Sequence, residues 1–129
     1  MSRDCFVYVI QREGADIVKV GMSDSPEARL ASLQAGSAER LFVHSRLAFP
    51  TRRAALDVEQ SFHAMKRAQG LTGEWYSMSA EQARFVLICS SVAYLTHVGC
   101  PNGDIHQALS AMGVCGAELA SIFGEGRVH

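Results

Sequence analysis

Four side chains with complementary chemistry follow one another in the first half of the chain: Tyr8, Lys19, Arg29 and Glu59. A phenol beside a cation can take part in proton transfer, and an arginine can bind two phosphate oxygens at once. A lone carboxylate can hold Mg²⁺ or Mn²⁺ together with water and phosphate oxygens. Brought together, these groups suit the hydrolysis of a phosphodiester bond.

Two β-branched and aromatic tracts, residues 5–10 and 17–22, predict the strands that carry the first two of these groups. The polar residues 11–16 between them predict a hairpin loop. If Tyr8 lies opposite Lys19, both side chains share one face, which we interpret as the floor of a site. The opposite face then holds four valines that we expect in the core: Val7, Val9, Val18 and Val20.

The following segment predicts a helix that carries Arg29. Ser25 is a good N-cap, Pro26 suits the first helical position, and the helix is expected to run to about Gln34. Residues 41–49 then alternate in the manner of a third strand. The sequence therefore places Arg29 between the second and third strands.

The middle of the chain predicts two further helices. Thr51 can cap a helix that carries Glu59 and runs to about Ala68. Residues 74–76 form a short extended piece, and Ser79 begins a capping box. The helix that follows is expected from about Ala80 to His97.

The last thirty residues predict a helical appendage. Residues 99–103 break the chain, Asp104 can cap a helix to about Met112, and a short helix spans Gly116 to Phe123. This pair weakly resembles a helix-turn-helix, but its second helix carries Glu118 and little basic charge. We therefore expect it to serve packing or dimerisation rather than DNA reading.

These elements predict an α/β (α+β) fold. It consists of a small three-stranded antiparallel sheet flanked by helices, with extra C-terminal helices. We expect one domain over residues 1–98 and the helical appendage over residues 99–129.

Composition limits the possible functions. The chain has 129 residues, 48% of them hydrophobic, which is enough for a folded core. Its net charge of −1 means that any nucleic-acid binding must come from a local patch. There is no apolar run of the ~20 residues that a membrane span needs and no signal-peptide pattern, so we expect a cytoplasmic protein.

The four cysteines do not form a CxxC pair, so we expect neither a zinc finger nor a redox motif. In a cytoplasmic protein they are expected to be reduced packing residues. A bridge between Cys89 and Cys100, or between Cys100 and Cys115, stays open at this point.

The tracts Phe6-Val7-Tyr8 and Lys19-Val20-Gly21, followed by Arg29 and Glu59, resemble the GIY-YIG endonuclease superfamily. The resemblance covers Phe6 to about Met78. It is nearest to a phage and bacterial branch whose second signature often reads Lys-Ile-Gly. It implies a DNA endonuclease that depends on Mg²⁺ or Mn²⁺.

The resemblance also implies roles for single residues. Tyr8 would activate water, Lys19 would lower the pKa of Tyr8 or replace the second tyrosine of the family, and Arg29 would stabilise the scissile phosphate. Glu59 would bind the metal ion, and His63 would touch the leaving group or a phosphate, or would instead have a structural role as a cap on the core. Supporting roles fall to three residues: Gly21, Glu74 and Trp75.

Several basic side chains are candidates for nucleic-acid contacts: Arg40, His44, Arg46 and Lys66. DNA is the expected substrate, and RNA is also compatible with this chemistry. A homodimer or a separate DNA-targeting partner would complete DNA binding. A different class stays open, in which the chain is a non-cleaving nucleic-acid-binding or regulatory interaction module.

Overall fold

The computed structural model describes residues 4–124. Its sheet contains four strands in the order β3-β1-β2-β4, and each pair of neighbours is antiparallel. The strands are β1 (Cys5–Arg12), β2 (Ile17–Ser23), β3 (Leu41–Phe49) and β4 (Trp75–Ser77). The α+β class is therefore confirmed, but the prediction of three strands is wrong, because residues near Trp75 pair with β2 as a fourth strand.

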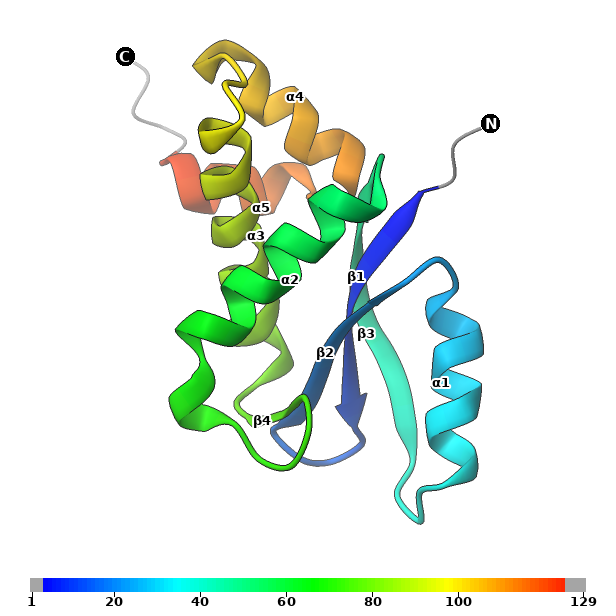
Figure 1. Ribbon diagram of the computed structural model, residues 1–129. Helices are drawn as coiled ribbons and strands as arrows, with labels where there is room; N and C mark the ends of the chain where they lie inside the picture. The colour runs from blue at the N-terminus through cyan, green and yellow to red at the C-terminus, as the bar shows by residue number, and fades with distance from the viewer. Residues whose placement is uncertain (1–3, 125–129) are drawn as a thin grey trace.

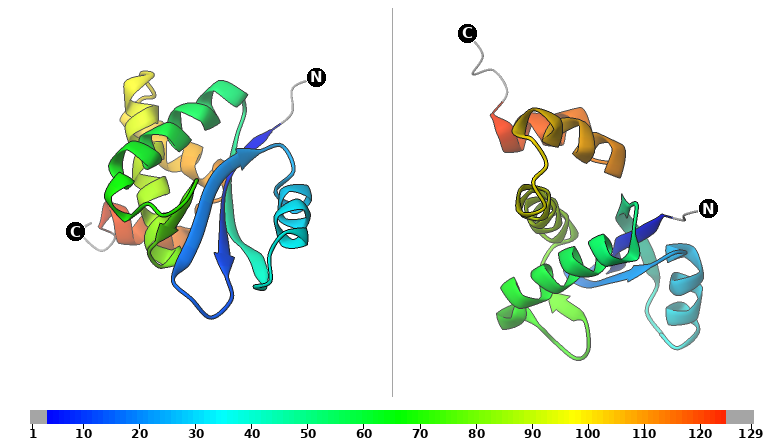
Figure 2. Two further views of the ribbon diagram at one scale, coloured as in Figure 1. Left: turned by 60° about the horizontal axis from the view of Figure 1, so that its bottom comes forward. Right: turned by 45° about the horizontal axis from the view of Figure 1, so that its top comes forward.

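Helices cover both faces of the sheet (Figure 1). They are α1 (Pro26–Ala35), α2 (Arg52–Met65), α3 (Ala80–His97), α4 (Asn102–Met112) and α5 (Gly116–Phe123), with a 3-10 turn, η1, at Arg67–Gln69. The left view of Figure 2 shows α1 alone on one side of the sheet, with α2 and α3 on the other. Its right view shows α4 and α5 together beyond α3.

The alternation of side chains along β1 and β2 divides the buried residues into two groups. The valine face packs against α2, α3 and α4 and forms the main core, as the sequence predicts. On the other face, Tyr8, Ile10 and Leu41 form a smaller cluster beneath Leu30 and Leu33 of α1. Tyr8 therefore lies inside the protein rather than on an open floor.

The predicted pairing of β1 with β2 is wrong by two residues. Tyr8 lies opposite Gly21, and Ile10 lies opposite Lys19. A shift of two keeps every side chain on its predicted face, whereas a shift of one would have exchanged the faces. Tyr8 and Lys19 thus still share a face, but they are not directly opposite.

The helix ends follow largely from their capping residues. The hydroxyls of Ser25, Thr51 and Ser79 each accept a backbone hydrogen bond at the start of α1, α2 and α3. The helix α2 ends at Met65, earlier than the predicted Ala68, because the chain tightens into η1.

At the C-terminal end, Pro101 rather than Asp104 occupies the N-cap of α4. Ile105, Leu109, Met112 and Val114 belong to the main core, so the C-terminal helices pack on the same core as the sheet. The four cysteines are free. Within residues 4–124, no helix is both long enough and apolar enough to cross a membrane.

Candidate functional site

The floor of the candidate site is formed by Tyr8 on β1 and Gly21 on β2, which lie opposite each other. A Cβ atom at position 21 would lie 2.5 Å from the Tyr8 hydroxyl oxygen and 3.3 Å from Glu74 Oε1. Glycine is therefore required here, because the phenol and the carboxylate occupy the space above its Cα atom. This close approach is a physical reason for the supporting role that we predicted for Gly21.

Arg29 joins this floor from α1. It is exposed at the surface, and its guanidinium hydrogen-bonds the Tyr8 side chain. Ser25 is the N-cap of α1, and its carbonyl oxygen accepts a hydrogen bond from the Arg29 backbone N–H, so Arg29 lies in the first turn of the helix. The start of α1 therefore places the exposed guanidinium of Arg29 beside the buried phenol of Tyr8.

The electrostatics of Tyr8 differ from the sequence expectation. Burial raises the pKa of Tyr8 above its usual value of 10.0, and the interaction with Arg29 opposes this shift only in part. The opposing interaction comes from Arg29 rather than Lys19, whose ammonium group lies 3.7 Å from Glu74 Oε1. The expectation that Lys19 lowers the pKa of Tyr8 is therefore wrong, and the phenol keeps its proton at neutral pH.

Lys19 is held between an acid and an aromatic ring. Its Nζ lies 3.7 Å from Glu74 Oε1 and 5.7 Å from the centre of the Trp75 ring. The residue is only 7% exposed, so the ammonium group is partly removed from water and both contacts gain weight. The pairing of β4 with β2 brings Glu74 into this ion pair with Lys19.

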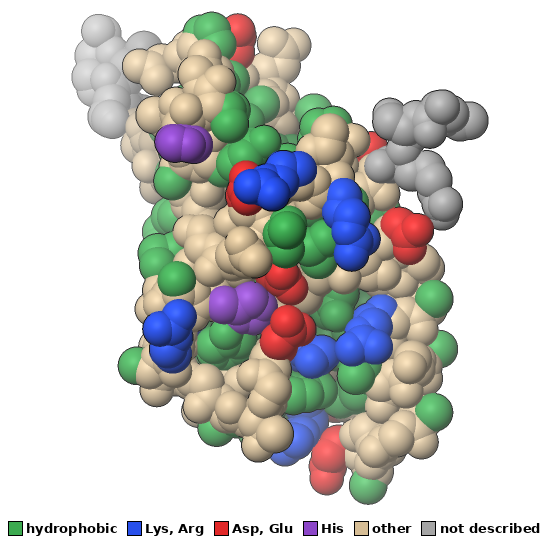
Figure 3. Space-filling model, viewed as in Figure 1, with side chains coloured by type: hydrophobic (Ala, Val, Ile, Leu, Met, Phe, Trp, Pro, Cys, Tyr) green, Lys and Arg blue, Asp and Glu red, His purple; other side chains and the backbone are tan. Residues whose placement is uncertain are grey.

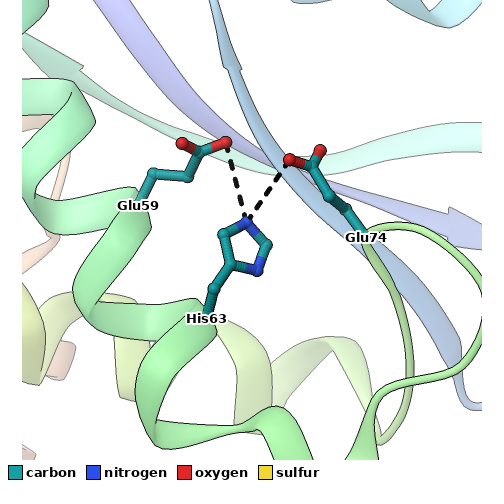
Figure 4. Close-up of side chains that lie close together, drawn as sticks. All are labelled: Glu59, His63 and Glu74. Atoms are coloured by element: carbon teal, nitrogen blue, oxygen red, sulfur yellow. Dashed lines mark ion pairs between the residues drawn. The ribbon is translucent and has the colours of Figure 1, made fainter.

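A second group of side chains lies next to this floor. Glu59 and His63 are one turn apart on α2, and Glu74 comes from the segment just before β4 (Figure 4). His63 Nε2 lies 3.6 Å from Glu59 Oε2 and 3.7 Å from Glu74 Oε2. One ligand atom from each residue lies within 4.8 Å of the other two.

This arrangement suits a divalent cation. Two atoms bound to one ion at about 2.1 Å can be at most about 4.2 Å apart, so the two measured separations fit directly. The Glu59 side chain is 10% exposed, while the half-exposed Glu74 can move closer by rotating. His63 Nε2 is buried and has no hydrogen-bond partner within residues 4–124. A buried nitrogen without a partner beside two carboxylates is the pattern that a metal ion would complete.

Figure 3 shows how this face presents its charges. Acidic side chains and a histidine lie near its middle, and lysine and arginine side chains lie on several sides of them. A hollow of about 320 Å³ adjoins the metal-binding candidates and is lined in part by His63, Glu74 and Arg67. The face thus combines a place for a cation with surrounding positive charge, which a polyanionic substrate requires.

The other predicted nucleic-acid contacts are not part of this group. Arg46 hydrogen-bonds Glu27 and lies over the Phe6 ring, and Arg40 pairs with Glu13 at 3.7 Å. His44 lies 3.6 Å from Glu81. His44 and Arg46 line a separate cavity of about 640 Å³ between β3, α3 and α5. The structure therefore brings together the N-terminal motifs and α2 but leaves these basic residues apart.

Sequence reasoning missed one participant. We expected Tyr76 to be a packing residue in the extended piece 74–76, yet its hydroxyl also hydrogen-bonds His63 Nδ1. No local pattern could have revealed this contact, because it depends on the pairing of β4 with β2 beneath α2. Lys66 is partly buried at the C-cap of α2.

Fold and site together define a small α+β domain with a candidate metal centre beside a tyrosine, a lysine and an arginine. Residues 5–90 match the family model of the T5orf172 domain. The chain therefore belongs to the T5orf172 domain family, a domain found in phage and bacterial nuclease-like proteins. No curated protein and no solved structure matches the chain. The matched region contains the whole candidate site and excludes α4 and α5.

Proposed function

We propose that this chain is a divalent-metal-dependent endonuclease that hydrolyses DNA phosphodiester bonds, of the GIY-YIG type. The observation that carries the proposal is a continuous set of neighbours. It runs from Arg29 through Tyr8 to Glu74, and from Glu74 through His63 to Glu59. Cationic, hydroxyl and carboxylate groups in one place are what phosphodiester hydrolysis needs.

Mg²⁺ or Mn²⁺ would be held by Glu59, with His63 and Glu74 beside it. When bound, such an ion polarises a phosphate oxygen and lowers the pKa of its water. The burial of Glu59 keeps its carboxylate away from bulk water, which strengthens its attraction for a cation. Lys19 holds the other oxygen of Glu74 and so limits the movement of that side chain.

Arg29 would bind the scissile phosphate. Its guanidinium reaches the surface while it also contacts the Tyr8 hydroxyl, so it can donate further hydrogen bonds to phosphate oxygens. These bonds would offset the negative charge that develops on the phosphate in the transition state.

Tyr8 would act in its protonated form. Because its pKa is raised, the phenol accepts a hydrogen bond from Arg29 and keeps a proton of its own. It can therefore position the guanidinium of Arg29, which reaches the surface, in place of the water-activating role expected from the resemblance. Proton removal from the attacking water then falls to another group or to solvent.

We expect the chain alone to bind DNA weakly. A net charge of −1 supplies little general attraction for DNA, and the basic side chains on β3 are already paired. A second copy of the chain or a separate DNA-targeting protein would supply the remaining affinity. The isolated chain should therefore cleave best at low ionic strength, where phosphate contacts are strongest.

The proposal is tested by incubating supercoiled plasmid with the purified chain in Mg²⁺, Mn²⁺ or EDTA. Glu59→Gln should abolish nicking, and Tyr8→Phe should reduce the rate, because Arg29 loses the buried hydroxyl that positions its guanidinium. Glu39→Gln makes the same chemical change at an exposed position away from the site and should leave nicking unchanged. Intact plasmid with every metal, together with retained DNA binding, would instead favour a non-cleaving binding module.

A further inference from the structure

His63 is held from both sides. Its Nδ1 hydrogen-bonds the Tyr76 hydroxyl, while its Nε2 lies 3.6 Å from Glu59 Oε2 and 3.7 Å from Glu74 Oε2. The two ring nitrogens therefore have separate surroundings, one a neutral hydroxyl and the other a pair of carboxylates. Which nitrogen carries the proton decides what the ring can bind.

Tyr76 is well placed to fix this ring. It is 5% exposed, and its backbone pairs with Val18 in the sheet. Its ring stacks on His63 with a centroid distance of 5.5 Å and an interplanar angle of 20°. It also meets the Phe62 ring edge-on, with a centroid distance of 5.3 Å and an interplanar angle of 89°. The strand, the stacking and the edge contact together leave the hydroxyl little freedom to leave Nδ1.

We propose that Tyr76 is a positioning residue that directs His63 Nε2 into a three-ligand metal centre with Glu59 and Glu74, and that this centre selects a transition-metal ion such as Mn²⁺ over Mg²⁺. The inference rests on the divalent-ion part of the proposed function. It adds a residue and a metal class to that function.

The hydrogen bond is compatible with the tautomer that a metal can use. When the Tyr76 oxygen accepts a hydrogen bond from Nδ1–H, the lone pair of Nε2 faces the two carboxylates. A second-sphere acceptor of this kind orients a metal-binding histidine and raises its basicity. Without the hydroxyl, the Nδ1–H group would lose its partner in a partly buried place, and the ring could turn its lone pair away.

The nitrogen ligand decides the class of ion. Mg²⁺ prefers oxygen ligands and gives up its water reluctantly, so it gains little from an imidazole. Imidazole suits first-row transition metals better, and Mn²⁺ accepts carboxylate oxygens as readily as nitrogen. A site built from two carboxylates and His63 should therefore hold Mn²⁺ in the absence of DNA, whereas Mg²⁺ would rely on phosphate oxygens for much of its binding.

The test measures metal affinity directly and without DNA. Free Mn²⁺ is counted by electron paramagnetic resonance, and Mg²⁺ binding is measured by competition with Mn²⁺. The wild-type chain should bind Mn²⁺ at least about 10-fold more tightly than Mg²⁺. Tyr76→Phe keeps the ring but removes the hydroxyl, and it should weaken Mn²⁺ binding by about 10- to 100-fold while Mg²⁺ binding changes much less. Tyr94→Phe on α3 removes a hydroxyl away from the centre and should change neither affinity.

A second measurement does not depend on the folding of the Tyr76 variant. Pulsed electron paramagnetic resonance of Mn²⁺ bound to the wild-type chain should show coupling to an imidazole nitrogen. His63→Gln should remove this coupling. Equal affinities for Mn²⁺ and Mg²⁺, absence of the nitrogen coupling, or unchanged Mn²⁺ affinity in a folded Tyr76→Phe variant would each overturn the inference.

The outcomes also separate this inference from the proposed function. A chain that nicks plasmid but binds both ions equally well would retain the nuclease and lose the three-ligand centre. A chain that shows the nitrogen coupling and the effect of Tyr76→Phe, but does not nick plasmid, would retain the centre and lose the nuclease.

Discussion

Replacing Gly21 with alanine tests the close approach of Tyr8 and Glu74 in the site. The new Cβ atom would lie 2.5 Å from the Tyr8 hydroxyl oxygen, 2.8 Å from Tyr8 Cζ and 3.3 Å from Glu74 Oε1. Carbon atoms in ordinary contact are about 3.5–4.0 Å apart, so the phenol would have to move by about 1 Å. Tyr8 is 1% exposed and packed beneath α1, which leaves no open space for that movement.

The expected size of the effect follows from two opposing contributions. Alanine in place of a strand glycine lowers the entropy of the unfolded chain and would by itself stabilise the protein by about 0.4–1 kcal/mol. Overpacking of a buried site costs about 1–3 kcal/mol. Overpacking should win, so Gly21→Ala should lower the free energy of unfolding by about 1–2 kcal/mol.

Urea unfolding of the variants measures this directly. Gly103→Ala is the matched control, since within residues 4–124 no atom beyond its chain neighbours and the nearby helix backbone lies within 4 Å of the new Cβ. The position is helical, so this variant should be slightly more stable. In the double variant Gly21→Ala/Tyr8→Phe, loss of the hydroxyl should recover part of the stability, seen as a coupling energy in the double-mutant cycle. A neutral or stabilising Gly21→Ala, or strictly additive effects, would refute the close approach of Tyr8 to Gly21.

Three further predictions concern other parts of the molecule. Thr51→Ala removes the hydroxyl that accepts from Ala54 N at 3.1 Å, and it should lower the free energy of unfolding by about 1 kcal/mol in urea titrations. Arg84 lowers the pKa of Glu118 from 4.5 to about 2, so this ion pair stabilises the fold above about pH 4.5 and is lost as the pH falls from 4.5 towards 2. Unfolding measured from pH 7 to pH 2.5 should show a loss of at most about 3 kcal/mol, reduced by partial exposure, and Glu118→Gln should flatten this dependence. Arg29→Lys keeps the charge but loses the planar pair of donors, and single-turnover cleavage should slow by at least about 10-fold, whereas equal rates would argue against a two-point contact with phosphate.

The sequence predicted local structure well wherever short-range chemistry determines it. The hydroxyls of Ser25, Thr51 and Ser79 start three helices at the predicted places, because N-capping depends only on residues within one turn. The division of β1 into a valine face and a tyrosine face was also correct, because it depends only on alternation.

The features that the sequence did not predict depend on contacts between distant segments. The turn at Gly14 is shorter than the predicted loop, so β1 continues to Arg12 and Tyr8 lies opposite Gly21 rather than Lys19. The pairing of β4 with β2 depends on residues more than fifty positions apart, so the extended tract near Trp75 could not be assigned to the sheet in advance. The raised pKa of Tyr8 follows from its burial under α1, which the sequence alone did not reveal.

The same limit applies to the site. The order of Tyr8, Arg29 and Glu59 along the chain predicted that they share one site. In the structure Tyr8 contacts Arg29, and Glu59 lies close by, next to His63. The contribution of Glu74 to the metal-binding candidates required the position of β4. The roles assigned to the individual residues in catalysis stay predictions until they are measured.

The central claim is that the group around Glu59 binds a divalent ion and uses it to hydrolyse DNA. The most direct measurement titrates Mn²⁺ against wild-type chain and Glu59→Gln, and records bound ion and plasmid nicking in the same samples. We expect wild-type nicking to rise over the concentration range in which the ion binds, and both to be lost in Glu59→Gln. Nicking that is equal in the two proteins, or wild-type protein that binds Mn²⁺ without nicking at any concentration, would contradict the claim.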